Sequence, residues 1–153
     1  MKESKPYESI LIAKYILSVA HNKGVPLNMT QLQKILFICY GYFLSQKDFI
    51  LLNEAPKAWP YGPVFPKTQK KIKLNDYLDL SESCFMEIED QTKNIIDIVV
   101  DLYKNISATA LSNWTHLVDS PWEKTTRLDG FKWNHPIPDQ FTKEYFSNIK
   151  VIG

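Results

Sequence analysis

The stretch between Ala58 and Pro66 most constrains what this chain can fold into. It reads Ala-Trp-Pro-Tyr-Gly-Pro-Val-Phe-Pro, with three prolines and one glycine among three aromatic residues. Proline fixes φ and removes a backbone donor, whereas glycine permits conformations that other residues avoid. Such a density of both predicts an ordered turn rather than a helix or the interior of a strand. Its aromatic residues could wedge the turn into the core or present a rigid apolar surface to a partner.

The composition points to one folded domain with little net charge. A chain of 153 residues is expected to form a single domain, and 44% hydrophobic with 13% aromatic residues suffices for one core. Lys and Arg total 18 against 17 Asp and Glu, so no large electrostatic field is available to hold nucleic acid or an anionic membrane. We therefore expect neither a nucleic acid nor a membrane as the partner.

The cysteines and the N-terminal segment indicate the compartment. Cys39 lies in an apolar helical pattern and Cys84 lies far along the chain, without metal-site spacing or the density of a disulfide scaffold. Apolar residues near the N-terminus are interrupted by Lys14 and Ser18 and end without a small-residue cleavage site. We expect reduced, buried thiols in a cytoplasmic protein with neither a signal peptide nor a membrane span.

Helical periodicity predicts the first two helices. Residues 7–22 repeat apolar side chains at helical spacing, and Gly24 stands where a C-terminal cap would be. Thr30 is the expected N-cap of a second helix over 31–45, which is apolar on nearly every face and should therefore be the buried central helix. Gly41 within this helix indicates that another backbone approaches closely.

The rest of the chain predicts short elements, most of them helical. Residues 49–52 and 55–59 are expected to form a small strand pair or an irregular extended arm, and residues 75–88 a turn with a short edge strand. Further helices are expected over 63–73, over 90–106 and 107–118 as an antiparallel pair, and from Pro138 or Asp139 through Phe146. The fold class is thus mainly α, a compact single-domain helical bundle with a small antiparallel β element.

No arrangement of side chains spells out a reaction. The three histidines, His21, His116 and His135, lie far apart without ligand partners at helical spacing, so no metal site is predicted. Asp119 could orient the His116 ring by a hydrogen bond, but a histidine that caps or packs at a helix end is the simpler interpretation. Cys39 lies on an apolar face, where a thiolate is disfavoured. We expect no catalytic residues, no metal and no cofactor.

A helix-turn-helix is an alternative for the first two helices. Residues 23–30 would form the turn, and Gln31, Gln33 and Lys34 could contact bases. Residues 32–44 are too apolar to lie exposed in a DNA groove beyond the first helical turn. This argues against a DNA-binding role, which stays the last of the alternatives.

Three stretches together resemble the Panacea domain family, also described as SocA-like antitoxins and phage-associated GepA-like proteins. Residues 27–42, LNMTQLQKILFICYGY, are similar to the family's "lqKLlyy.qg" helix, and residues 55–66 look like its "aW.yGPV.p" motif. Residues 111–116, followed by Pro121 and Trp122, are similar to its "ls..th....pw" segment. The order and spacing of the three match across nearly the whole chain.

The resemblance implies a bacterial or prophage protein without enzymatic activity. Family members act as antitoxins that neutralise a small protein toxin by direct binding, and at least one branch delivers its toxin to a protease. We accordingly expect a single SocA-like domain over 1–153 that binds a cognate toxin. The alternatives are an adaptor that hands its partner to a protease, a phage-associated DNA-binding protein, and an enzyme acting through Tyr61 and His116 in one pocket.

The family motifs also indicate which residues face a partner. Carried over residue by residue, the partner-binding set is Gln33, Lys34, Trp59, Tyr61, Gly62, Pro63, Trp114, Thr115, His116 and Trp122. The chain departs from the family by carrying Pro60 where a basic or polar residue is common. The tryptophans are more often core than interface, whereas Tyr61 and His116, with polar tips on rigid apolar bodies, suit a shared groove better.

Overall fold

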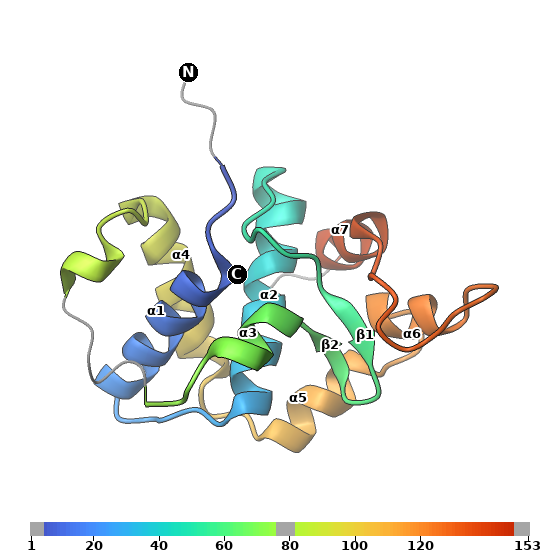
Figure 1. Cartoon of the computed structure of the whole chain (residues 1–153), viewed down its shortest axis with the longest axis horizontal. Helices are drawn as coiled ribbons and strands as arrows, with labels where there is room; N and C mark the ends of the chain where they lie inside the picture. Colours follow the sequence, from blue (N-terminus) through green and yellow to red (C-terminus); the bar gives the residue numbers. More distant parts are fainter. Residues whose placement is uncertain (1–4, 76–81, 149–153) are drawn as a thin grey trace.

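The computed structural model describes residues 5–75 and 82–148, which form a helical bundle with one small sheet (Figure 1). Along the described part of the chain the elements are α1 (Ser9–Asn22), α2 (Met29–Lys47), β1 (Lys57–Trp59), β2 (Gly62–Val64), α3 (Pro66–Lys71), the 3-10 helix η2 (Glu82–Phe85), α4 (Asp90–Tyr103), α5 (Ala108–Thr115), α6 (Pro121–Thr126) and α7 (Asp139–Ser147). The predicted fold class, mainly α with a small antiparallel β element, is confirmed.

Local sequence fixes both ends of α2. The Asn28 side chain accepts a hydrogen bond from the backbone N–H of Gln31 (2.8 Å), and the Gln31 side chain accepts one from the N–H of Asn28 (3.0 Å). This capping box starts the helix at Met29, so the expected N-cap Thr30 is wrong, because the Asn28 side chain already caps the N–H of Gln31 in the first turn. The helix ends at Asp48, which adopts the left-handed conformation with φ 49°.

The apolar helix α2 is the centre of the bundle, as its sequence predicts. Helices α1 and α4 pack on one side of it and α7 on the other (Figure 1). The expectation that the helices at 90–106 and 107–118 pair with each other is wrong. The buried face of α4 packs on α1 and α2, whereas α5 packs on α2 and β2, so α2 separates their main contacts.

Gly41 does mark a close approach, but by a ring rather than by a backbone. A Cβ atom at position 41 would lie 2.2 Å from two ring carbons of Phe146 on α7. The Phe146 ring is buried and also meets Phe37 edge-on, with ring centroids 5.8 Å apart. The absent side chain at position 41 is therefore what lets α7 lie close against α2.

The proline-rich stretch folds into a β-hairpin. β1 and β2 pair antiparallel, with Lys57 opposite Val64, Ala58 opposite Pro63 and Trp59 opposite Gly62. Pro60 and Tyr61 consequently form the two-residue turn. The ordered turn predicted for this stretch is present at Pro60 and Tyr61, although short strands flank it on both sides. The expected start of the next helix at Pro63 is wrong, because α3 begins at Pro66.

Pro63 is tolerated in β2 because of its position in the pairing. Its opposite residue, Ala58, directs its own N–H and carbonyl away from β2 to the loop 134–137, so the ladder needs no donor from position 63. Gly62 precedes it with φ 115°, a conformation that side-chain-bearing residues rarely adopt. Strand β2 thus accommodates both Gly62 and Pro63, the residue types that a strand interior usually excludes.

The segment before the hairpin is an extended arm. The N–H of Tyr7 donates to the carbonyl of Leu51 (2.8 Å), and the N–H of Asn53 donates to the carbonyl of Tyr7 (2.9 Å). The Glu54 carboxylate then accepts hydrogen bonds from the backbone N–H groups of Lys67 (2.8 Å) and Thr68 (3.2 Å) in the first turn of α3. Of the two alternatives, the extended arm holds for residues 49–54 and a strand for 57–59.

The remaining expectations have mixed outcomes. The described part of 75–88 contains η2 rather than an edge strand, and residues 76–81 lie outside the described residues. Cys39 is buried, and burial raises the pKa of its thiol, but Cys84 is exposed, contrary to expectation. Within the described ranges, no helix combines the length and the hydropathy that crossing a bilayer requires.

We expect Gly41→Ala to lower the free energy of unfolding by about 1–3 kcal/mol, as overpacking of a core does. The new methyl group would meet the Phe146 ring directly. Urea denaturation followed by circular dichroism measures the loss. In a Phe146→Leu background the same substitution should cost less, because the smaller side chain leaves room; an equal cost in both backgrounds would contradict this account of Gly41.

Candidate functional site

Two side chains of α2 complete the outer edge of β2. The N–H of Phe65 donates to Gln33 Oε1 (2.9 Å), and Gln33 Nε2 donates to the carbonyl of Phe65 (3.2 Å). Lys34 Nζ donates to the carbonyl of Pro63 (3.2 Å). The Gln33 amide therefore makes the pair of hydrogen bonds that a neighbouring strand would make. Because Pro63 has no N–H, each outward backbone group at positions 63 and 65 has a partner.

The outer edge of β1 is completed by a loop far along the chain. The N–H of Ala58 donates to the carbonyl of His135 (2.9 Å), and the N–H of Asn134 donates to the carbonyl of Ala58 (2.8 Å). The Asn134 side chain also accepts a hydrogen bond from Trp59 Nε1 (2.9 Å). The hairpin is thus held from both sides, by α2 and by the loop 134–137.

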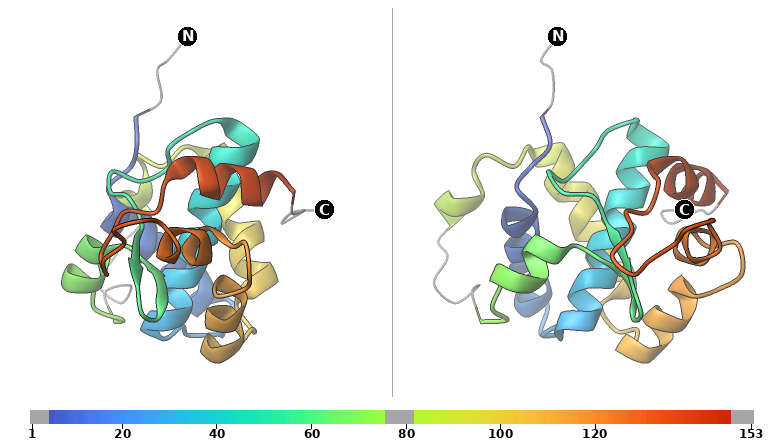
Figure 2. Two further views of the ribbon diagram at one scale, coloured as in Figure 1. Left: turned by 90° about the vertical axis from the view of Figure 1, so that its right-hand side faces the viewer. Right: turned by 45° about the vertical axis from the view of Figure 1, so that its right-hand side comes forward.

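Aromatic side chains join the hairpin to α5 and α6, which lie beside it (Figure 2). Trp122 Nε1 donates to the carbonyl of Trp59 (2.8 Å). His116 stacks on Trp122 with ring centroids 4.0 Å apart and planes at 17°, and Trp133 also stacks on Trp122 at 6.2 Å and 27°. Trp133 is half exposed, so this stack reaches the surface.

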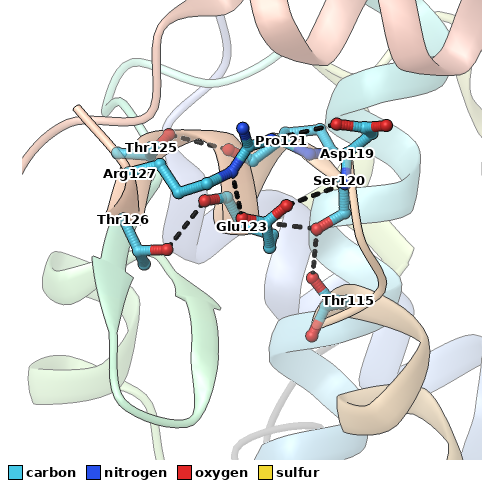
Figure 3. Close-up of polar contacts among 8 residues, drawn as sticks. All are labelled: Thr115, Asp119, Ser120, Pro121, Glu123, Thr125, Thr126 and Arg127. Carbon is cyan, nitrogen blue, oxygen red and sulfur yellow. Dashed lines mark hydrogen bonds and ion pairs between the residues drawn. The ribbon is translucent and has the colours of Figure 1, made fainter.

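The turn that carries His116 is fixed by its own polar contacts (Figure 3). Ser120 Oγ donates to the carbonyl of Thr115 (2.7 Å) and accepts from the N–H of Glu123 (3.1 Å), so it caps α6. The Glu123 carboxylate accepts from the N–H of Asp119 (2.9 Å) and pairs with Arg127. These contacts fix the start of α6 relative to the end of α5.

Asp119 does not orient the His116 ring. Its carboxylate pairs with Arg127 Nη2 at 2.9 Å, as Figure 3 shows, and its backbone lies in the left-handed region with φ 69°. The expected hydrogen bond between Asp119 and His116 is therefore wrong, because the turn directs the carboxylate to the surface. His116 is oriented instead by stacking on Trp122 and by a hydrogen bond with the backbone of Tyr61.

Burial shifts the pKa values of the two basic groups beneath the hairpin. Burial lowers the pKa of Lys34 from its ordinary 10.5 to about 8. Burial also lowers the pKa of His116, with the positive charge of Lys34 acting in the same direction and the hydrogen bond with the Tyr61 backbone opposing it. His116 Nε2 is buried and has no hydrogen-bond partner among the described residues. The ring is accordingly neutral near pH 7.

The structure brings most of the sequence-predicted partner-binding residues together around the hairpin. Tyr61 at the turn is 71% exposed. Trp59, His116 and Trp122 are partly buried, and the rest of this cluster is buried: Gln33, Lys34, Gly62, Pro63 and Thr115. Trp114 is the exception, because its ring packs against Tyr145 and Phe146 of α7. Tyr61 is thus the member of the predicted set best placed to touch a partner.

The same burial bears on the helix-turn-helix alternative. Gln33 and Lys34 are each only 1% exposed and are directed at β2. Gln31 is used by the capping box and donates to the carbonyl of Ile106 (2.9 Å). These side chains cannot contact bases in this fold, so the base contacts imagined for this alternative are wrong.

A small pocket opens at the hairpin between α2, β2 and α3. It has a volume of about 210 Å³ and is lined by Met29, Thr30, Gln33, Lys34, Trp59, Tyr61, Val64 and Gln69. His116 is not among its lining residues, so this pocket is not the one that an enzyme acting through Tyr61 and His116 would need. Among the described residues, no group of three or more His, Cys, Asp or Glu side chains is arranged to hold a metal ion.

Sequence reasoning missed several residues that build this site. Gln69 extends the Gln33 network by accepting a hydrogen bond from its Nε2 (3.3 Å), and Asn134 fixes Trp59. Ser120 caps α6, and its signal is local, since Ser followed by Pro and then Glu at the third helical position marks a helix start. No comparable signal marks Asn134 or Gln69, because their roles depend on tertiary contacts.

The sequence of the chain matches a known protein family over the region that builds the candidate site. The family described as "Antitoxin SocA-like, Panacea domain" matches residues 32–123, more than half of the chain, and the chain belongs to it. The matched region runs from α2 through the hairpin to the first turn of α6, and so contains most of the candidate site.

A particular relative is "Antitoxin SocA" of Caulobacter vibrioides (strain NA1000 / CB15N), which is 33% identical to this chain over 64 residues. The match covers 42% of this chain and 34% of the relative, so the chain spans about a third of the relative's length. No solved structure matches the chain.

We expect Gln33→Met to lower the free energy of unfolding by about 1–3 kcal/mol, the cost of leaving one buried backbone group unpaired. The substitution keeps the side-chain size but leaves the N–H of Phe65 without a partner, whereas the carbonyl of Phe65 still accepts a hydrogen bond from the N–H of Gln69 (3.0 Å). Urea denaturation measures the effect. Gln46→Met, at an exposed position of the same helix, is the matched control and should have little effect. Equal effects of the two would contradict the role given to Gln33.

Lys34 should make stability depend on pH. The unfolded chain holds this proton up to about 10.5, whereas the folded protein releases it near 8. Between these values the unfolded state binds more protons, so the free energy of unfolding rises with pH. The difference in stability between wild type and Lys34→Met should therefore grow in favour of wild type, by on the order of 1–2 kcal/mol from about pH 7.5 to about pH 9.5. A constant difference across that window would contradict the buried-ammonium assignment.

Proposed function

We propose that this protein is an antitoxin that neutralises a cognate protein toxin by direct binding. The observation that carries the proposal is its membership of the SocA-like antitoxin family, whose match contains α2, the hairpin and α5. The curated relative named as an antitoxin supports the same role. The toxin would be encoded beside this chain in a toxin–antitoxin locus or prophage, and both proteins would act in the cytoplasm.

The geometry of the hairpin supports a binding role. Tyr61 is held at the turn by a strand pair whose two edges are both hydrogen-bonded, so its position is largely fixed before a partner arrives. A fixed aromatic side chain loses little conformational entropy on binding. Tyrosine and tryptophan are also the residue types that most often dominate the binding energy of protein interfaces. We place the toxin-binding surface around the exposed Tyr61 and the partly buried Trp59.

Neutralisation by masking needs no chemistry from this chain, and we propose a non-enzymatic mechanism without a cofactor. His116, the side chain first considered as a base, lies outside the pocket and has its Nε2 buried. It stacks on Trp122 and supports the hairpin from below. Its role in this proposal is to keep the backbone of Tyr61 in place.

The test is co-expression of the tagged chain with the product of the adjacent reading frame, with growth and capture recorded in the same cells. We expect the neighbouring product to arrest growth when expressed alone, and this chain to restore growth and to retain that product in a pull-down. Growth arrest that persists despite expression of this chain would contradict the antitoxin role.

Tyr61→Ala should weaken capture of the toxin at least about tenfold, since hot-spot residues contribute about 2 kcal/mol or more and 1.4 kcal/mol corresponds to tenfold. Because Tyr61 is exposed, the free energy of unfolding should change little. The matched control is Leu102→Ala on α4, which removes an exposed apolar side chain from the side of the bundle away from the hairpin (Figure 1). Equal affinities of the two variants would move the binding surface elsewhere.

A further inference from the structure

The pocket beside the hairpin carries an uncompensated positive charge. Lys34 is the one charged side chain among the described residues that line it. No carboxylate of the described residues lies within ion-pair distance of Lys34 Nζ, and that side chain is only 1% exposed. Lysine is almost never so fully buried unless it is paired. The Lys34 ammonium is thus buried without an acidic partner among the described residues.

The ammonium group also has unused hydrogen-bonding capacity. It carries three N–H donors, and one of them donates to the carbonyl of Pro63 (3.2 Å). Burial acts against a positive charge here and lowers the pKa of Lys34, and the Lys34 charge in turn helps to lower the pKa of His116. An anion that enters the pocket would compensate the charge and accept a strong, charge-assisted hydrogen bond.

The walls of the pocket define what kind of anion fits. Val64, Met29 and Trp59 supply apolar surface, while Thr30 and Gln69 supply neutral polar groups. A volume of about 210 Å³ lies below the roughly 300–1,000 Å³ of pockets for drug-sized ligands, so one amino-acid side chain is a better fit than a cofactor. A short apolar stem that ends in a carboxylate matches this combination of surfaces. A phosphate matches it less well, since a single lysine lacks the paired fork by which arginine binds phosphate.

The position of the pocket points to a protein as the source of that side chain. The pocket shares Tyr61 and Trp59 with the surface proposed for toxin binding. We propose that the pocket receives the carboxylate side chain of a glutamate or aspartate exposed on the toxin, and that the Lys34 ammonium recognises its charge. The identity of the partner rests on the proposed function, whereas the preference for a carboxylate rests on the pocket alone.

The experiment is an NMR titration of the full chain labelled with ¹³C-lysine. The probes are N-acetyl-glutamate N-methylamide and the matched N-acetyl-glutamine N-methylamide, which differ in the carboxylate. We expect a saturable shift of the Lys34 ε-CH₂ signal with the acidic probe only, together with a rise in the pH at which that signal titrates. The same response to both probes, or no response to either, would overturn the proposal. Tighter binding of inorganic phosphate than of the acidic probe would also overturn it.

Two variants separate Lys34 from the other lysines. Lys34→Met should abolish the response to the acidic probe, detected on ¹⁵N backbone signals around the pocket in a protein whose remaining spectrum shows that it is folded. Lys70→Met, which removes an exposed lysine of α3 outside the pocket lining, should leave that response unchanged. Loss of the response in both variants would overturn the assignment to Lys34. If Lys34→Met fails to fold, the wild-type titration with the two probes decides.

The titration uses no toxin, so its result is independent of the co-expression test. A response to the acidic probe in a protein that captures no toxin would support the carboxylate site and contradict the proposed function. Capture of the toxin by a protein that shows no response would overturn the carboxylate site and leave the antitoxin role standing. Where both succeed, an Asp-to-Asn and Glu-to-Gln scan of the toxin should find one position whose substitution weakens wild-type binding but has no further effect on Lys34→Met.

Discussion

The contact between α2 and the outer edge of β2 is the constraint on which the site depends. A two-stranded hairpin is marginally stable alone, and this one is tied down by the Gln33 amide on Phe65 and the Lys34 ammonium on Pro63. Since α2 is also the centre of the bundle, the hairpin is attached directly to the helix around which the core is packed. The position of Tyr61 at the turn follows from this attachment.

The same contact explains why an otherwise apolar helix carries two polar residues in its buried face. Each serves a backbone group that would be costly to bury without a partner. Gln33 does so without a charge, but Lys34 adds the cost of desolvating an ammonium, which lowers its pKa. An apolar side chain of similar volume would avoid that cost and leave only the carbonyl of Pro63 unpaired. The charge of Lys34 therefore does not add to the stability of the fold, and the proposed carboxylate site would give it a partner.

Periodicity and local caps were enough to predict most helices, because those signals lie within a few residues of one another. The apolar pattern identified α2 as central, and Ser107 and Asp139 mark helix starts that the structure confirms. Strand β2 was not predicted, because a strand accepts a proline at position 63 only where the proline nitrogen faces away from the neighbouring strand β1. The family motifs named residues that the fold brings together around the hairpin, but sequence alone could not show that most of them are buried and that Tyr61 is exposed.

The closure of β1 by residues 134–137 has a consequence for how the protein is made. Trp59 and its partner Asn134 are separated by 75 positions in the chain. At roughly 5–20 residues per second, synthesis takes on the order of 4–15 s to cover that interval. During this interval residues 134–137 are not yet available to hydrogen-bond the outer edge of β1. An unpaired strand edge can pair with another chain. A nascent chain is therefore open to mispairing at β1 from the time the hairpin has left the ribosome until residues 134–137 have also emerged.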